Sequence, residues 1–195
     1  MAVKEESHRA RQAQATKEQV ARAARELFAE QGYVATTITA ISEAARIPAQ
    51  TIYSAFGNKA AILKEISRIW IVEAETRRLA QESLAIADPA ARLRAAAHWQ
   101  TRQFETGVDV IRIYQEAARV DAEIAEQFER MLWAREQELE IYLKSFKGQL
   151  KPKALDLFIA CTAAEIYRTL VLDRNWPVED YERWLADTLV SQLLR

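Results

Sequence analysis

Glycine and proline, the residues that most tight turns require, are scarce in this sequence. The 195 residues contain only four of each, about 4 % in total, whereas an average protein has about 12 %. Sandwiches, barrels and doubly wound sheets need many tight turns, so these folds are disfavoured. Much of the chain consists instead of residues that favour helices, such as alanine, glutamate, leucine and arginine. We therefore expect an all-α protein.

Other features exclude several functional classes. The charged N-terminus contains no apolar stretch of the kind that a signal peptide has. Apolar runs such as Leu157–Ala164 are far shorter than the roughly 18 residues of a membrane span, so no membrane contact is expected. The single cysteine, Cys161, cannot form an internal disulfide, which favours a cytoplasmic location. With only two histidines besides, we expect no metal site, no cofactor and no enzymatic activity.

Charge is distributed unevenly along the chain. Residues 1–68 contain 10 lysines and arginines against 7 acidic residues, whereas residues 69–195 contain 17 against 21. A mildly basic first third on an acidic remainder hints at an anionic partner for that third.

The apolar residues recur with a helical period between the glycines and prolines. Residues 16–31 carry an amphipathic stripe, begin with a Thr16–Gln19 capping box and end before Gly32. A short helix capped by Thr36 or Thr37 follows, and Pro48 begins another. Further helices are expected at about 58–87, 89–106, 108–120, 122–146, 152–172 and from Pro177 onward, with Asn58 and Asp88 as the caps of the first two. The helix over 58–87 would be about 45 Å long and could link two bodies.

The two short helices on either side of residues 45–47 form a candidate helix-turn-helix motif. Ile52 and Phe56 would face inward, which leaves small and polar side chains of the second helix to face outward. Such side chains near the start of a recognition helix suit base edges in the major groove. By pattern alone, a plain packing corner between helices remains an alternative.

Residues 32–63 resemble the N-terminal DNA-binding domain of the TetR/AcrR family of transcriptional regulators. The matching residues are Phe28, Gly32, Tyr33, Thr36, Thr37, Ile41, Ala45, Ile47, Thr51, Ile52, Tyr53, Phe56, Lys59 and Leu63. The tail, residues 167–194, resembles the last two helices of many members, whereas about 75–150 matches only as generic helix.

The resemblance implies a three-helix N-terminal helix-turn-helix domain and a C-terminal helical domain for ligand binding and dimerisation. We expect a flexible tail over 1–15, the DNA-binding domain over 16–57 and the ligand-binding domain over 58–195. The implied function is that of a homodimeric regulator, typically a repressor, that binds a palindromic double-stranded DNA operator and is released by a small-molecule effector.

The resemblance also assigns residues to the DNA interface. The positions that match DNA contacts of the family are Thr37, Thr39, Gln50, Thr51, Tyr53, Ser54 and Lys59. Gln50 and Ser54 are expected to contact bases, and Ala49 beside them could meet a thymine methyl group. Arg46 replaces the usual glycine of the turn, so it must accept a left-handed conformation or reshape the turn, and it could add a phosphate contact. Pro48 replaces the usual polar cap.

Two further sets of residues are predicted in the C-terminal domain. Dimer contacts are expected from Phe158, Tyr181, Trp184, Leu185, Thr188, Leu189 and Gln192. About three of Trp99, Phe104, Tyr114, Met131, Trp133, Cys161 and Tyr167 are expected to line a ligand pocket. In both sets, burial in the core of one chain is the alternative. At the level of function, the alternatives are a ligand-independent DNA-binding protein and a helical small-molecule binder without a DNA role.

Overall fold

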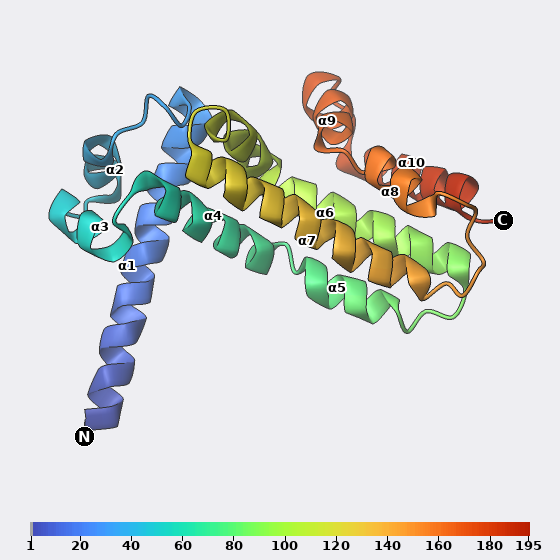
Figure 1. Ribbon diagram of the computed structural model, residues 1–195, viewed down its shortest axis with the longest axis horizontal. Coiled ribbons are helices and arrows are strands. Elements are labelled where there is room, and N and C mark those ends of the chain that lie inside the picture. Colours follow the sequence, from blue (N-terminus) through green and yellow to red (C-terminus); the bar gives the residue numbers. More distant parts are fainter. Residues whose placement is uncertain (1) are drawn as a thin grey trace. The chain divides into compact units, whose positions relative to one another are not determined.

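The computed structural model describes residues 2–195, with side chains from Arg9 onward. Its helices (Figure 1) are α1 (Ala2–Gln31), α2 (Ile38–Ala45), α3 (Ala49–Phe56), α4 (Lys59–Glu73), α5 (Thr76–Ser83), α6 (Pro89–Ala117), α7 (Ala122–Lys144), α8 (Ala154–Cys161), α9 (Ala164–Tyr167), the π-helical η1 (Arg168–Asp173) and α10 (Val178–Leu193). Within the described part, the extended pairing is a single isolated bridge between Leu150 and Leu194. The all-α prediction is confirmed.

The chain divides into two compact units. The N-terminal unit comprises Met1–Trp70 and Asp109–Phe128, and the C-terminal unit comprises Ile71–Val108 and Glu129–Arg195. The domain boundary expected at residue 57 falls inside the N-terminal unit, because α4 buries Ile62, Leu63 and Ile66.

The N-terminal unit is built on α1. Val20, Ala24 and Phe28 of its apolar stripe are buried, as the period in the sequence predicts. In Figure 1, α2 lies against the second half of α1, and α3 follows α2 after a short turn. Ile41 of α2 and Ile52 of α3 complete the buried cluster.

Three predicted helix caps are present. The side-chain oxygen of Thr37 accepts a hydrogen bond from the Ala40 amide at 3.1 Å. Asn58 accepts from the Ala61 amide at 2.8 Å, and Asp88 accepts from the Ala91 amide at 2.7 Å. Each cap satisfies an amide that the first turn of a helix leaves without a backbone partner.

The start of α1 differs from the prediction. The helix already includes Ala2, so residues 2–15 of the expected tail are helical, and residue 1 lies outside the described residues. Thr16 is not a cap, because its hydroxyl donates to the Gln12 carbonyl at 3.0 Å inside the helix. The physical reason is composition: the tail is rich in helix-forming residues and contains no glycine or proline that would stop a helix.

Two predicted helices are interrupted where the sequence contains no glycine or proline. The helix expected over 58–87 breaks between α4 and α5, where Glu75 has a φ of 52°. The helix expected over 152–172 breaks after α8, where Thr162 donates its hydroxyl to the Phe158 carbonyl at 2.8 Å and Ala163 is extended. By contrast, the expected break at Gly107 is present as a non-helical residue inside α6.

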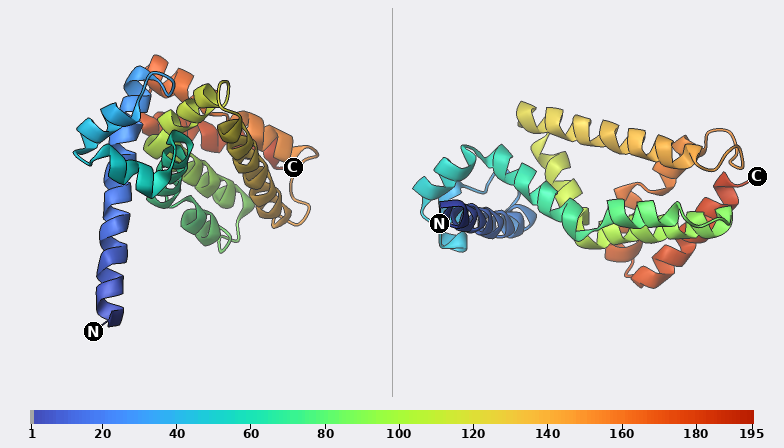
Figure 2. Two further views of the ribbon diagram at one scale, coloured as in Figure 1. Left: turned by 60° about the vertical axis from the view of Figure 1, so that its left-hand side comes forward. Right: turned by 90° about the horizontal axis from the view of Figure 1, so that it is seen from below.

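The C-terminal unit contains a core of large side chains from several helices. Its fully buried members include Leu93, Phe146, Phe158, Tyr181 and Leu185. Helices α8 and α10 pack against each other in this unit (Figure 2). No helix among the described residues is both long and apolar enough to span a membrane.

Candidate nucleic-acid interface

The turn between α2 and α3 is fixed by a compact set of hydrogen bonds. Arg46 has a left-handed backbone, with φ 54° and ψ 37°, so the first of the two predicted possibilities for this position is the observed one. The Ile47 amide donates to the Ser42 carbonyl at 3.1 Å, and the Ser42 hydroxyl donates to the Ile47 carbonyl at 2.7 Å. These bonds close the turn without a glycine.

Helix α1 also supports the turn. The Gln19 side-chain amide donates to the Ala45 carbonyl at 2.8 Å and so satisfies one of the last acceptors of α2. The sequence predicted a capping role for Gln19 within its own helix, and the structure gives it this longer-range role instead. Pro48 begins α3 without a side-chain cap, as expected, and its carbonyl accepts from the Thr51 amide at 2.8 Å.

Helix α3 buries one side and exposes the other. Ile52 is only 1 % exposed, whereas Tyr53 is 52 % exposed. Gln50, Thr51 and Ser54 are exposed as well, and Ala49 is half-buried. The small and polar side chains that the sequence assigned to DNA therefore face outward.

The remaining predicted contacts lie close to α3 in the chain. Thr37, Thr39 and Arg46 are all exposed. The Thr37 oxygen already accepts the capping bond from the Ala40 amide, but its hydroxyl hydrogen is available for a phosphate.

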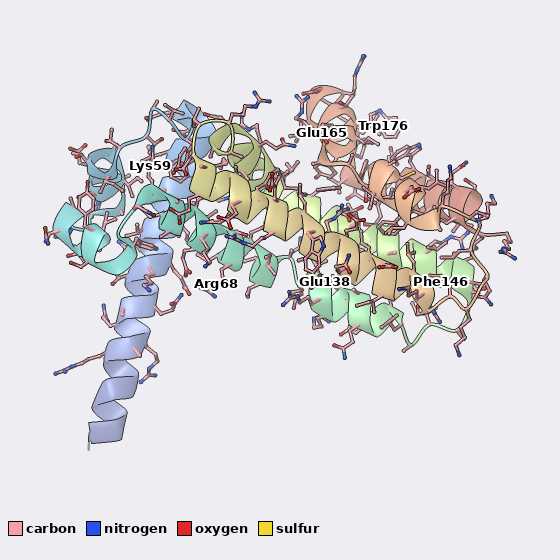
Figure 3. The ribbon with its side chains drawn as sticks, in the orientation of Figure 1. Lys59, Arg68, Glu138, Phe146, Glu165 and Trp176 are labelled. Atoms are coloured by element: carbon pink, nitrogen blue, oxygen red, sulfur yellow. The ribbon has the colours of Figure 1, made fainter. Side chains whose placement is uncertain are left out.

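Lys59 has a structural role that sequence reasoning missed. Its ammonium group at the start of α4 (Figure 3) donates to the carbonyls of Tyr33 at 2.6 Å, Thr36 at 2.9 Å and Val34 at 3.5 Å. It also lies 4.3 Å from the centre of the Tyr33 ring. Burial lowers the pKa of the Lys59 ammonium, and the charge of Asp121 partly offsets this. Its predicted phosphate contact stays a prediction, and making it would require some of these bonds to be given up.

The second part of α6 is bound to the end of α1. The Arg25 guanidinium forms a two-pronged pair with the Asp109 carboxylate, at 2.7 and 2.6 Å. The Arg112 side chain donates to the Ala29 carbonyl at 2.8 Å. A guanidinium–carboxylate fork is a geometrically specific contact, so it fixes the register between these two helices.

Tyr33, just after α1, makes two further contacts with the same segment. Its amide donates to the Glu116 carboxylate at 3.1 Å, and its hydroxyl donates to the Asp121 carboxylate at 3.2 Å. Burial raises the pKa of the Tyr33 phenol and the charge of Asp121 raises it further, so the phenol remains a neutral donor. Residues 109–121 therefore hold the loop that leads into α2.

The residues predicted for a ligand pocket are divided between the two units. Tyr114 belongs to the N-terminal unit, where it is buried and its hydroxyl donates to the Leu63 carbonyl at 3.4 Å. In the C-terminal unit, Trp99, Phe104 and Tyr167 are buried in the core, whereas Cys161 and Met131 are half-buried. Trp133 is 66 % exposed, so it lies on the surface rather than in an enclosed wall.

The predicted dimer residues require a correction. Phe158, Tyr181, Leu185 and Leu189 are completely buried within one chain, so they have no surface to offer a partner. Their apolar periodicity reflects the packing of α10 against α8, which was the alternative stated for Tyr181, Leu185 and Leu189. The other predicted residues keep accessible surface, Trp184 and Thr188 in part and Gln192 more fully.

Two short helices are joined by a turn with one left-handed residue, and the second helix exposes a polar side. Together with the mainly helical remainder of the chain, these features define a helix-turn-helix regulatory protein. Residues 20–66 match the family described as bacterial regulatory proteins, tetR family. The chain thus carries the N-terminal domain of this family, which confirms the resemblance deduced from the sequence. Because the family consists of regulators, the expectation that the chain is not an enzyme is confirmed too.

Solved structures share the fold over nearly the whole chain. The fatty acid degradation regulator FadR from Bacillus halodurans superposes with a TM-score of 0.73 at 18 % identity, covering 90 % of this chain and 94 % of that one. A protein from Saccharomonospora viridis in complex with choline gives 0.71 at 18 %, covering 93 % and 99 %. The TetR-family regulator PfmR from Thermus thermophilus gives 0.66 at 21 %, covering 90 % and 99 %. No curated protein matches the sequence significantly.

Proposed function

We propose that the protein is a transcriptional regulator that binds an operator in duplex DNA as a homodimer and is released from it by a small molecule, acting as a repressor in the cytoplasm. The observation that carries the DNA-binding part is the exposed side of α3 opposite buried Ile52. Its support from comparison is the tetR-family match over residues 20–66.

The side chains of α3 are suited to two kinds of DNA contact. The Gln50 amide can pair with adenine through two hydrogen bonds, and Ser54 can bond to several base edges. Thr51 and Tyr53 carry hydroxyls that reach phosphates, which position a recognition helix without specifying sequence. Arg46, at the turn, adds a cation beside the same surface.

A two-fold dimer would present two copies of α3 to half-sites about 34–36 Å apart, and so predicts a pseudo-palindromic operator. The surface that remains for this dimer on α10 is formed by Trp184, Thr188 and Gln192. These residues are spaced four apart, so they lie along one side of the helix.

A release mechanism requires a ligand that binds one conformation better than the other. Helix α6 is suited to transmit such a change, because it begins in the C-terminal unit and ends in the N-terminal one. Its non-helical residue, Gly107, lies two positions before Asp109, which forms the fork with Arg25. Neighbours of known structure include a regulator of fatty acid degradation and a choline complex, which supports a small organic effector for this fold.

The test begins with selection of duplexes from a random oligonucleotide pool by the purified full chain. We expect one palindromic sequence to be enriched and the affinity to fall steeply with salt. By fluorescence anisotropy, Gln50→Ala should reduce discrimination at one base position by about 1–3 kcal/mol. Tyr53→Phe should weaken binding to all sequences alike. The matched control for Gln50→Ala is Gln81→Ala, at an exposed position of α5.

Three outcomes distinguish the alternatives. Absence of any preferred duplex would refute the DNA-binding function and favour a helical small-molecule binder. A preferred operator that no small molecule releases would favour a ligand-independent DNA-binding protein. An unchanged preference in Gln50→Ala would show that Gln50 does not contact a base.

A further inference from the structure

Arg135 is a partly buried arginine of α7 in the C-terminal unit, and it was not among the residues singled out from the sequence. Its Nη2 donates to the Thr162 hydroxyl at 2.7 Å, the Thr162 carbonyl at 3.5 Å and the Gln100 side-chain oxygen at 3.3 Å. Gln100 and Thr162 are themselves almost completely buried. The guanidinium of α7 therefore joins a polar cluster between α6 and the end of α8.

The charge of Arg135 is not balanced by an acidic group. Surface arginines of the same unit have carboxylate partners, such as Arg77 with Glu138 at 3.0 Å and Arg183 with Asp180 at 2.8 Å. Among the residues that the structure describes, none provides a carboxylate to Arg135. Burial lowers the pKa of its guanidinium, which nevertheless remains protonated at neutral pH. A cation that is partly withdrawn from water loses hydration, and here no carboxylate of the described residues replaces it.

Capping of α8 accounts for only part of this arrangement. The carbonyl of Thr162 lies at the C-terminal end of that helix, where the dipole carries about half of a negative charge. Only Nη2 takes part in these bonds. In the described part of the chain, Nε and Nη1 have no hydrogen-bond partner, so an edge of the guanidinium remains open for a two-pronged contact.

Apolar rings adjoin the polar cluster. Trp99 precedes Gln100 in α6, and its ring stacks on Phe158 with the centres 5.8 Å apart. The carbonyl of Phe158 accepts the hydroxyl hydrogen of Thr162, so the residue that carries one of these rings is bonded to a partner of the guanidinium. Leu139, one turn beyond Arg135 on α7, is buried too. The segments that supply the polar partners of Arg135 therefore also supply buried aromatic rings.

Three buried hydroxyls in the same unit have no hydrogen-bond partner in the described structure; Thr101 and Tyr181 carry two of them, and Thr76 carries the third. Thr101 follows Gln100 in α6. Burial raises the pKa of the Tyr181 phenol, and the nearby Cys161, which precedes Thr162, contributes to the rise. Both hydroxyls are therefore neutral donors, and unsatisfied donors at such depth are rare in native proteins.

We propose that the C-terminal unit binds an organic carboxylate whose acid group pairs with Arg135 and whose apolar body lies against the rings of Trp99 and Phe158. A monoanion with a hydrocarbon body fits one cation among aromatic rings better than a strongly hydrated dianion such as phosphate does. The inference rests on the proposed function for its regulatory meaning, because it names the class of effector that would release the protein from DNA.

The experiment measures ligand binding by the DNA-free full chain, through thermal shift and calorimetry. The probes are octanoate and phenylacetate, with octan-1-ol and 2-phenylethanol as their neutral counterparts and inorganic phosphate as a hydrated anion. We expect at least one carboxylate to bind about tenfold or more tightly than its alcohol, since only the carboxylate can form a charge-assisted pair with the guanidinium. Arg135→Gln should lose this preference, whereas the matched control Arg77→Gln should keep it.

The inference is overturned if neither carboxylate binds better than its alcohol, if phosphate alone binds, or if Arg135→Gln binds the carboxylates as the wild type does. The comparison of acid with alcohol uses the wild type alone, so it decides the question even where the variant fails to fold. Operator binding is measured separately. A protein that binds its operator but no carboxylate refutes only this inference, whereas one that binds a carboxylate through Arg135 and stays on DNA refutes only the proposed release.

Discussion

Arg46 provides a test in which stability and DNA affinity should change in opposite directions. Its left-handed backbone costs a non-glycine residue about 1–2 kcal/mol, and glycine avoids this cost. Glycine also gives the unfolded chain more conformational entropy, which lowers stability by about 0.5–1 kcal/mol. The net effect of Arg46→Gly should therefore be a stabilisation of about 0.5–1 kcal/mol. For a chain of this size, the melting temperature should rise by about 2 °C. The side chain is exposed, so its removal sacrifices no packing.

The assay is thermal unfolding by circular dichroism at a fixed protomer concentration, together with operator binding at several salt concentrations. Loss of a phosphate contact would reduce the slope of log affinity against log salt by about 0.9. Arg46→Ala is the control, because it removes the charge but keeps the Cβ and its strain. We expect it to lose DNA affinity as Arg46→Gly does, without gaining stability. An equal or lower melting temperature for Arg46→Gly would refute the argument from backbone strain.

Three further predictions concern the N-terminal unit and one glycine outside it. Lys59→Met should lower the free energy of unfolding in urea by about 2 kcal/mol, because backbone carbonyls lose a charged donor; an unchanged value would show that the ammonium is not structural. Gly32→Ala should cost about 1 kcal/mol more than Gly148→Ala in the same assay. Both glycines have a positive φ, but only at Gly32 would the new Cβ lie 2.6 Å from a carboxylate oxygen, that of Glu116, so equal costs would contradict this account. The pKa of Glu65 is lowered chiefly by a hydrogen bond from the guanidinium one turn further along α4, so its contribution to stability exists above pH 4.5, the ordinary pKa of the group, and is lost as the pH falls below it. Between pH 7 and pH 3 the free energy of unfolding of the wild type should therefore fall by up to about 1 kcal/mol more than that of Glu65→Gln. Parallel curves of unfolding free energy against pH would contradict this prediction.

Local signals in the sequence predicted much of the fold. Thr37, Asn58 and Asp88 are caps, and Gly107 interrupts its helix, because each effect depends on residues within a few positions. The exposed side of α3 followed from a helical period around buried Ile52.

Effects that depend on distant residues were not predictable in this way. Lys59 carries a charge suited to phosphate, and only the three-dimensional structure shows that carbonyls more than twenty positions earlier bind it. The stripe of Leu185 and Leu189 is apolar whether it faces a partner or its own chain. Arg135 is one arginine among many in the sequence, and its unbalanced charge becomes evident only when its neighbours are known.

The two-segment construction of the N-terminal unit sets an order of events during synthesis. On the ribosome, α1, α2 and α3 emerge before residues 109–121 are synthesised. Arg25 and Tyr33 therefore cannot form their bonds to the acidic side chains of that segment until later. At about 5–20 residues per second, the interval between Trp70 and Phe128 lasts several seconds. A fragment truncated at Trp70 would lack those partners for good, so a minimal DNA-binding protein cut from this gene should keep residues 109–128.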